Sequence, residues 1–389
     1  LAWRWHFYAG LFVAPFMVLL AVTGIIYLFK PQLDPLMYGD LLTVPAAEHA
    51  LSADEQLVRA KLAYPQGVVS QYLPPVSPTR SAQFVVHNDG RELTVFVDPY
   101  RGTVLGEQDA KYNLQAIARA LHGELMIGTT GDRLIELAAG WGVMLVVSGL
   151  YLWWPRGKSP AGILWPRFNT RGRVFWRDLH AVAGFWGAAF LLVMLLSGMT
   201  WTGFWGKQYA DLWNTFPAAM WNSVPQSDQQ ARVLNTATQQ TVPWALENTP
   251  MPMSGDHAEH MNHGAMHAGP AAPTVRLQQV VDLANARKVE PGYSITFPTT
   301  AEGVFTIAVF ADDPRNDATL HVDQYTGKVL ADVRWEHYNL VARATETGVM
   351  LHEGKMFGWV NQLIVLLICL MILLSAVSGV VIWWKRRPQ

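Results

Sequence analysis

Four long runs of apolar residues divide the chain. Each is about 20 residues or longer, which is the length that an α-helix needs to cross the hydrocarbon core of a bilayer. The runs cover about residues 7–29, 134–154, 181–205 and 357–384. The pattern therefore predicts four transmembrane helices, separated by two long polar segments and one short one.

The four runs fall into two pairs of copies. The second and fourth runs are each preceded by Leu-His, at His122 and His352, and each ends in Ser-Gly-x-x-x-Trp-Trp. Corresponding residues of these two copies are separated by a constant 230 positions (352 − 122). The first and third runs match at His6 and His180, with an offset of 174 (180 − 6). Repeats of this kind indicate an internally duplicated chain.

The two long polar segments also repeat each other. In each, alternating apolar residues are followed by a turn glycine and another apolar pair, a pattern that predicts a β-hairpin. The matching hairpin segments are 95–105 and 320–330, with further strands expected at 83–87 and 304–310. A helix is expected after Ser52, which forms a capping box with Glu55, and its counterpart follows Thr274. The predicted fold class is an α+β membrane protein with two helix-plus-antiparallel-sheet domains.

Basic residues predict the orientation of the membrane helices. They gather in the short segment between the second and third runs, at Arg156, Lys158, Arg167, Arg171, Arg173 and Arg177. Arg4 precedes the first run and Lys385 begins a basic C-terminus, so both termini are expected in the cytoplasm. The first run has no small-residue cleavage motif and is expected to stay in the protein as a signal anchor.

These signals divide the chain into eight expected segments. They are a first membrane helix (1–29), a first extracytoplasmic domain (30–121), a second membrane helix with a histidine at its outer start (122–154), a basic cytoplasmic loop (155–178), a third membrane helix (179–205), a second domain (206–351), a fourth membrane helix (352–384) and a cytoplasmic tail (385–389).

Composition supports a membrane protein and narrows its chemistry. Charged residues make up only 15% of the chain, apolar residues 51%, and the net charge of −1 gives no reason to expect a nucleic-acid partner. The single cysteine, Cys369, rules out an intrachain disulfide framework and a Cys-x-x-Cys-His site for covalent haem.

An insert at about 250–270 in the second domain has no counterpart in the first. It interleaves methionine with four histidines, which are His257, His260, His263 and His267. Thioether and imidazole together favour copper, especially Cu(I). The alternative is an incidental polar loop, and the sequence leaves both open.

The paired elements resemble the PepSY-associated transmembrane family over the whole chain except the insert. The motifs that carry the resemblance are Leu-His-x-x-x-x-x-Gly at the start of the second and fourth copies and Ser-Gly-x-x-x-Trp-Trp at their ends. The resemblance implies two periplasmic PepSY-like domains on four helices in a bacterial inner membrane. It further implies similarity to ferric-siderophore (ferrioxamine-type) reductases, which carry two non-covalent b-type haems.

The histidines support the same cofactor independently. His6 and His180 are expected at cytoplasmic helix ends, and His122 and His352 at periplasmic ends. Two imidazoles at the same depth on facing helices are what a six-coordinate haem iron requires. The alternative for each is an interfacial histidine that hydrogen-bonds a neighbour.

Two further features bear on these sites. Gly10 and Gly184 lie one turn beyond His6 and His180, where a missing side chain would let a flat macrocycle approach; small-residue helix packing is the alternative. His337 has no histidine counterpart in the first copy and is expected to be an ordinary domain residue.

The function expected from these observations is transmembrane electron transfer. No Gly-x-Gly-x-x-Gly motif for a flavin or nicotinamide follows a strand, so the predicted chemistry is one-electron transfer by haem. The expected substrate is a periplasmic ferric siderophore, reduced to release Fe(II), and the donor is a quinol or a cytoplasmic flavin protein. Two alternatives stay open: a non-redox PepSY sensor or inhibitor-like binding module, and a periplasmic cupric reductase or metal-handling protein.

Overall fold

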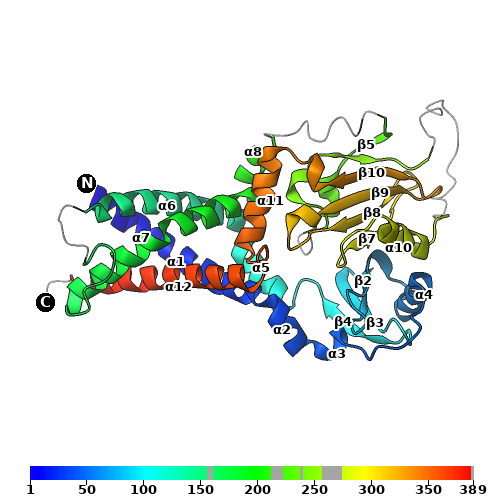
Figure 1. The fold of residues 1–389 in the computed structure, drawn as a ribbon, viewed down its shortest axis with the longest axis horizontal. Helices are drawn as coiled ribbons and strands as arrows, with labels where there is room; N and C mark the ends of the chain where they lie inside the picture. Colours follow the sequence, from blue (N-terminus) through cyan, green and yellow to red (C-terminus); the bar gives the residue numbers. More distant parts are fainter. Residues whose placement is uncertain (156–160, 212–220, 222, 237–239, 256–273, 387–389) are drawn as a thin grey trace. The chain divides into compact units, whose positions relative to one another are not determined.

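The computed structural model describes residues 1–155, 161–211, 221, 223–236, 240–255 and 274–386 (Figure 1). The chain forms two compact units that alternate along the sequence. The first unit comprises Leu1–Lys30, Ile117–Asp211 and Thr347–Gln389, and the second comprises Pro31–Ala116 and Leu212–Glu346.

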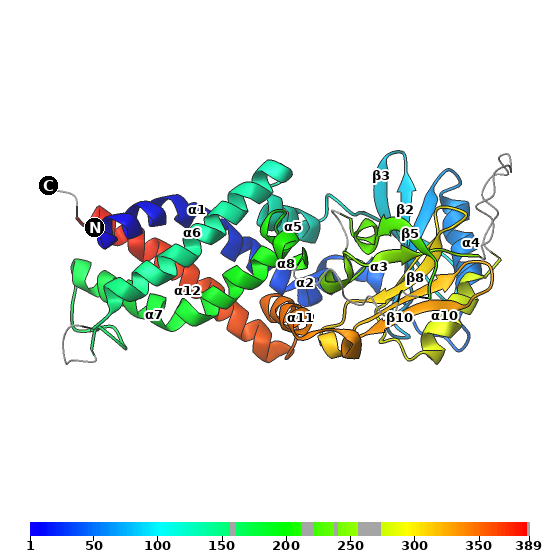
Figure 2. The same ribbon diagram turned by 90° about the horizontal axis from the view of Figure 1, so that it is seen from above.

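The first unit is a bundle of four long helices. They are α1 (Ala2–Leu28), α6 (Thr129–Trp153), α7 (Gly172–Gly198) and α12 (Trp359–Trp384). All four are long and apolar enough to cross a membrane, which confirms the four predicted spans, and the third continues through the short helix η1 (Met199–Trp201). Each packs on two others, in the cyclic order α1, α6, α7, α12. Figure 2 shows the four helices from above.

Apolar side chains cover the outside of the bundle as well as its interior. On α7 the large residues Trp186, Phe190 and Val193 are exposed, while Leu195 is buried against Val13 of α1. A helix that is apolar on every face is stable in hydrocarbon rather than in water. The pattern identifies a membrane protein.

Two short helices precede α6 and α12. They are α5 (Leu114–Glu124) and α11 (Leu340–His352). The sequence predicted that His122 and His352 begin the membrane helices themselves, but the structure places each in the last turn of the short helix before it. The physical reason is a left-handed backbone in the connections, including Gly128 at φ 63° and Gly358 at φ 57°, which interrupts the helix where only glycine is free of strain.

The second unit contains one eight-stranded antiparallel sheet. Its strands are β1 (Val68–Leu73), β2 (Ala82–Asn88), β3 (Arg91–Val97), β4 (Val104–Asp109), β7 (Ser294–Thr296), β8 (Val304–Val309), β9 (Ala318–Asp323) and β10 (Val329–Arg334). Their order is β10-β9-β8-β7-β1-β2-β3-β4. The predicted hairpins are confirmed as β3–β4 and β9–β10.

The two halves of this sheet are joined by one strand pair. The sequence predicted a separate domain in each long segment, whereas β1 pairs with β7 through Gln71 opposite Thr296 and Tyr72 opposite Ile295. Each half would otherwise leave a strand edge with unpaired backbone groups, and pairing the two edges satisfies both. The internal duplication itself remains a prediction from the sequence.

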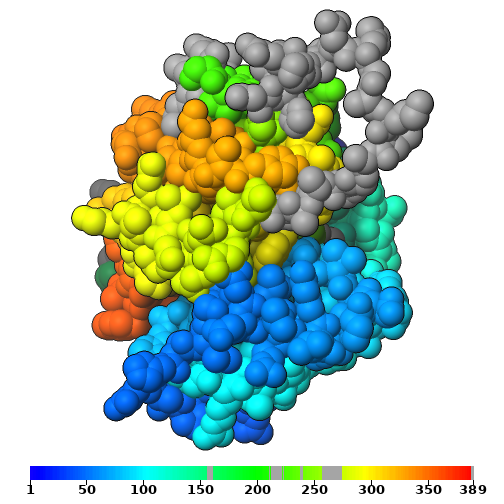
Figure 3. Space-filling model, turned by 90° about the vertical axis from the view of Figure 1, so that its right-hand side faces the viewer, coloured from blue at the N-terminus to red at the C-terminus, as the bar shows by residue number. Residues whose placement is uncertain are grey.

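Two helices cover one face of the sheet over a shared core. They are α4 (Ala53–Ala63) and α10 (Leu277–Ala286). The predicted capping box of Ser52 and Glu55 is confirmed, with the Ser52 N–H donating to Glu55 Oε2 over 2.8 Å. The helix starts are also tied together, because Asp54 accepts from the Leu277 N–H over 3.0 Å. Figure 3 shows α4 in blue beside α10 in yellow on this face.

The remaining elements are short. They are α2 (Lys30–Met37), α3 (Gly39–Leu42), α8 (Trp205–Asp211), β5 (Gln226–Gln230), η2 (Ala231–Leu234), η3 (Trp244–Leu246), β6 (Pro250–Pro252), η5 (Pro314–Asn316) and η6 (Trp335–His337). Two of them, β5 and β6, pair as a separate two-stranded antiparallel sheet.

Candidate functional site: two histidine pairs

The four histidines singled out in the sequence lie as two pairs within the membrane unit. The ring centroids of His6 and His180 are 6.4 Å apart, with the ring planes at 84°. Those of His122 and His352 are 6.2 Å apart, with the planes at 86°. The partners are the ones that the sequence argument matched by depth.

The two pairs are spaced along the same helices. On α1, His6 belongs to the first pair and Thr23 contacts His122 of the second, 17 positions on (23 − 6). On α7, His180 and Ser197 repeat the spacing (197 − 180). At 1.5 Å per residue this corresponds to about 25 Å, against a hydrocarbon thickness of about 30 Å. The pairs therefore lie toward opposite ends of the bundle.

Each of the four imidazoles has a hydroxyl group at its Nδ1 atom. The contacts are His6 to Ser148 at 2.8 Å, His122 to Thr23 at 3.0 Å, His180 to Ser378 at 3.0 Å and His352 to Ser197 at 3.0 Å. Among the described residues, no hydrogen bond engages the Nε2 atom of any of the four. Nε2 is therefore the ring nitrogen left for a ligand.

A glycine follows each of these hydroxyl residues and makes room for the imidazole. A Cβ atom added to the glycine would meet the histidine Cε1 at 3.5 Å for Gly24, 3.2 Å for Gly149, 3.1 Å for Gly198 and 3.7 Å for Gly379. Sequence reasoning recognised two of these dipeptides as repeat markers and missed their role. The signal was available, because a hydroxyl residue followed by glycine recurs near the end of all four apolar runs.

Gly10 and Gly184, which the sequence suggested as room for a flat macrocycle, do not contact the paired histidines. At Gly10 an added Cβ would contact only Leu145, at 3.9 Å, and at Gly184 it would meet nothing within 4 Å. Open space at Gly184 suits either a bound planar group or the hydrocarbon of the membrane. The four glycines that follow hydroxyl residues are the ones in contact with the histidines.

The distance between paired rings fits two axial ligands of one metal. An imidazole nitrogen lies about 2 Å from a bound metal. The bond lengths of the five-membered ring place the same nitrogen about 1.2 Å from the ring centroid. Two imidazoles on opposite sides of one metal would therefore have centroids about 6.4 Å apart. Perpendicular ring planes are compatible with this arrangement, since each ring contains the metal–nitrogen axis and rotates about it.

The donor set favours haem over a structural metal ion. Within the described ranges, no group of three or more His, Cys, Asp or Glu side chains is placed to hold a metal ion. A structural zinc ion would need about four such ligands from the protein. A haem iron would need only two, because the porphyrin provides four nitrogens. The residues present at each pair fit a haem.

Histidines elsewhere have structural partners or lie outside the description. His321 is buried in the second unit with Nδ1 at 3.0 Å from Thr306 Oγ1, and burial lowers its pKa to about 4. His337 Nδ1 accepts a hydrogen bond from the Arg334 N–H over 2.9 Å. The insert histidines His257, His260, His263 and His267 lie outside the described residues.

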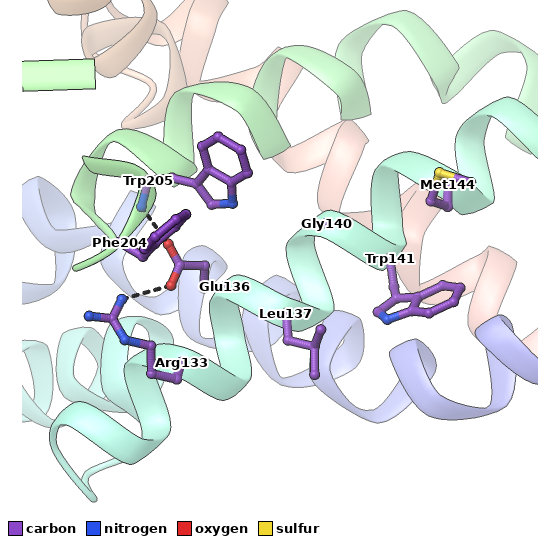
Figure 4. A pocket seen from close by; sticks show the side chains of 8 residues that line it. All are labelled: Arg133, Glu136, Leu137, Gly140, Trp141, Met144, Phe204 and Trp205. Atoms are coloured by element: carbon purple, nitrogen blue, oxygen red, sulfur yellow. Dashed lines mark hydrogen bonds and ion pairs between the residues drawn. The ribbon is translucent and has the colours of Figure 1, made fainter. Parts of the chain in front are cut away.

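A cavity of about 510 Å³ lies beside α6 (Figure 4). None of the four paired histidines lines it. On its wall, Glu136 accepts hydrogen bonds from Thr202 Oγ1 at 2.7 Å, the Trp205 N–H at 2.6 Å and Arg133 at 2.8 Å. One buried carboxylate thus fastens the start of α8 to α6.

Replacing Glu136 with alanine is expected to lower the thermal stability of the detergent-solubilised protein. The Trp205 N–H would lose its acceptor, and a buried donor left unpaired costs about 1–3 kcal/mol. Thr202 Oγ1 would keep the Met199 carbonyl and the half-exposed Arg133 would keep Asp132, so these two losses add less. Circular dichroism melting would measure the change. Glu136→Gln keeps an acceptor oxygen for Thr202 and Trp205, so its melting temperature should fall between wild type and Glu136→Ala. Equal melting temperatures for all three would contradict this role.

Comparison with known proteins places the chain in a family. The family model for the PepSY-associated TM region matches residues 3–386. The match covers nearly the whole chain and includes both of its units. No curated protein matches it. The chain is therefore a member of the PepSY-associated TM region family.

Proposed function

We propose that this membrane protein is a di-haem electron conduit that reduces a ferric siderophore on the periplasmic side of a bacterial inner membrane and so releases Fe(II). The observation that carries the proposal is the pairing of His6 with His180 and of His122 with His352, at ring separations of 6.4 and 6.2 Å. Family membership agrees with the proposal but does not by itself identify a reaction.

Each histidine pair is proposed to hold one non-covalent b-type haem through its two Nε2 atoms. When bound, haem supplies a one-electron iron couple. The chain contributes the imidazoles, the hydroxyl groups that contact them, and a bundle whose apolar side chains exclude water. The spacing of about 25 Å between the pairs would place one at each end of the hydrocarbon layer.

The direction of transfer follows from the expected orientation. The positive-inside rule places the basic segment between α6 and α7 in the cytoplasm, with the pair His6 and His180. A quinol or a cytoplasmic flavin protein is proposed as donor, and the second unit as the surface that receives the ferric siderophore. Reduction releases the iron because Fe(II) binds hard oxygen ligands less tightly than Fe(III) does.

Haem quantitation on the purified protein tests the proposal. The wild-type chain is expected to carry two haems, with a Soret band that shifts on dithionite reduction. His352→Ala should carry one, because a single axial imidazole is left at its site. His337→Ala is the matched control and should keep both, since His337 lies outside either pair.

Two results would count against this function. A wild-type preparation without a Soret band would favour the alternative of a non-redox PepSY sensor or inhibitor-like binding module. Two full haems on His352→Ala would remove His352 from the ligand set. The cupric-reductase alternative rests on the His/Met insert, whose four histidines lie outside the described residues.

A further inference from the structure

We propose that Thr23, Ser148, Ser197 and Ser378 are positioning residues that hold each imidazole with its hydrogen on Nδ1 and its Nε2 lone pair facing the partner histidine. The inference rests on the proposed function, because it explains how two neutral imidazoles are prepared for one metal. Sequence reasoning assigned none of these four residues a role at the histidines, although Ser148 and Ser378 open the two Ser-Gly-x-x-x-Trp-Trp motifs.

The hydroxyl hydrogen of three of these residues is already committed within its own helix. The oxygen lies 2.7 Å from the carbonyl one turn back, in the pairs Thr23 to Leu19, Ser148 to Met144 and Ser197 to Val193. A hydroxyl has one hydrogen to donate and two lone pairs with which to accept. Since the hydrogen goes to the carbonyl, the oxygen accepts from the imidazole, and the imidazole must carry its hydrogen on Nδ1.

His180 reaches the same tautomer by a second route. Its Nδ1 lies 3.0 Å from the Ser375 carbonyl oxygen as well as 3.0 Å from Ser378 Oγ. A carbonyl oxygen can only accept, so Nδ1 of His180 must be the donor. Ser378 Oγ donates to the same carbonyl over 3.1 Å, which leaves its own lone pairs for the imidazole.

This tautomer is the one that a metal bound at Nε2 requires. A neutral imidazole with its hydrogen on Nδ1 has its lone pair on Nε2, and an acceptor at Nδ1–H makes that lone pair more basic. His337 shows the opposite arrangement, since its Nδ1 accepts from a backbone N–H. A hydroxyl at Nδ1 is therefore not common to every described histidine, although the buried His321 of the second unit shares it through Thr306.

The first pair offers an internal comparison. Ser148 is the one Nδ1 partner of His6 within the described chain, whereas His180 has both Ser378 and the Ser375 carbonyl. Removing the Ser148 hydroxyl leaves the His6 Nδ1–H without an acceptor. Removing the Ser378 hydroxyl leaves the carbonyl in place. Two substitutions at one metal site should therefore differ in their effect.

The test compares Ser148→Ala and Ser378→Ala in the full chain, purified with haem. Haem transfer to apomyoglobin measures retention, and a spectroelectrochemical titration measures the midpoint potential of each haem. Ser148→Ala is expected to weaken retention at the site of His6 and His180 roughly 10-fold and to raise the potential of that haem alone. The potential rises because a less basic imidazole stabilises the ferric state less. Ser378→Ala should change both quantities less.

Three further variants complete the design. Ser148→Thr restores a hydroxyl and should restore retention and potential. Ser375→Ala removes a hydroxyl from the same helix but keeps the carbonyl, and should match wild type. If Ser148→Ala does not give folded protein, Ser148→Cys keeps the side-chain volume with a weak acceptor and should shift the potential in the same direction.

The outcomes separate this inference from the proposed function. Two haems with unchanged potentials and retention in Ser148→Ala would overturn the role of the hydroxyl and leave the function standing. Equal shifts in Ser148→Ala and Ser378→Ala would overturn the assignment of the Ser375 carbonyl. A wild-type chain that binds no haem would overturn the function, and this inference with it.

Discussion

Replacing His180 with alanine is expected to abolish electron transfer across the membrane and to leave the other histidine pair intact. His6 would lose its partner at one end of the bundle, while the second pair lies about 25 Å away along α1 and α7. One remaining site cannot cover a hydrocarbon layer of about 30 Å. The measurement is Fe(II) production by proteoliposomes with reductant sealed inside and a ferric siderophore and a ferrous-iron chelator outside.

Two controls set the lower and upper limits of the Fe(II) production rate. His180→Ala should fall to the rate of protein-free vesicles and still carry one haem. His337→Ala, which keeps both pairs, should match wild type. A His180→Ala protein that transfers electrons at the wild-type rate would show that the first pair is not part of the conduit, and that the donor delivers electrons directly to the second.

Adding a methyl group at Gly198 is expected to disrupt the His352 site more than the same change at Gly379 disrupts the His180 site. The new Cβ at Gly198 would lie 3.1 Å from His352 Cε1, so the ring must move, whereas at Gly379 the separation from His180 Cε1 would be 3.7 Å, an ordinary contact. Forcing extra volume into a packed site costs about 1–3 kcal/mol. Gly198→Ala should therefore lose most of one haem and Gly379→Ala little.

The other two glycines extend this comparison to a graded series. Gly149→Ala, with a separation of 3.2 Å, should resemble Gly198→Ala but act on the site of His6. Gly24→Ala, at 3.5 Å, should resemble Gly379→Ala. Haem content per chain and the melting temperature measure the series. A Gly379→Ala protein damaged as much as Gly198→Ala would show that these glycines matter for backbone conformation rather than for room at the imidazole.

The sequence by itself determined the elements and the histidine partners. Apolar runs of bilayer length do not depend on tertiary context, so the four membrane helices could be predicted directly. The hairpins and the Ser52 capping box are likewise local, because turn glycines and a side chain three residues away decide them. The matching of His6 with His180, and of His122 with His352, followed from repeats along the chain.

The tertiary structure decided what depends on backbone direction and on contacts between distant segments. A run of apolar residues does not show where a helix is interrupted, so the placement of His122 and His352 on α5 and α11 required the left-handed connections to be seen. Likewise, alternating apolar residues predict strands but not which edges meet, and the joining of β1 to β7 is a choice between edges far apart in sequence.

The tautomer of each imidazole is the feature that the sequence predicts least. Whether a histidine presents Nε2 or Nδ1 depends on which neighbouring atom accepts its hydrogen, and that neighbour comes from another helix, as Ser148 does for His6. The sequence contains the hydroxyl residue and the glycine after it, but 142 positions separate Ser148 from its histidine. The packing of α1 on α6 brings the two side chains to 2.8 Å. A hydrogen bond depends on that distance in space and not on the separation in sequence.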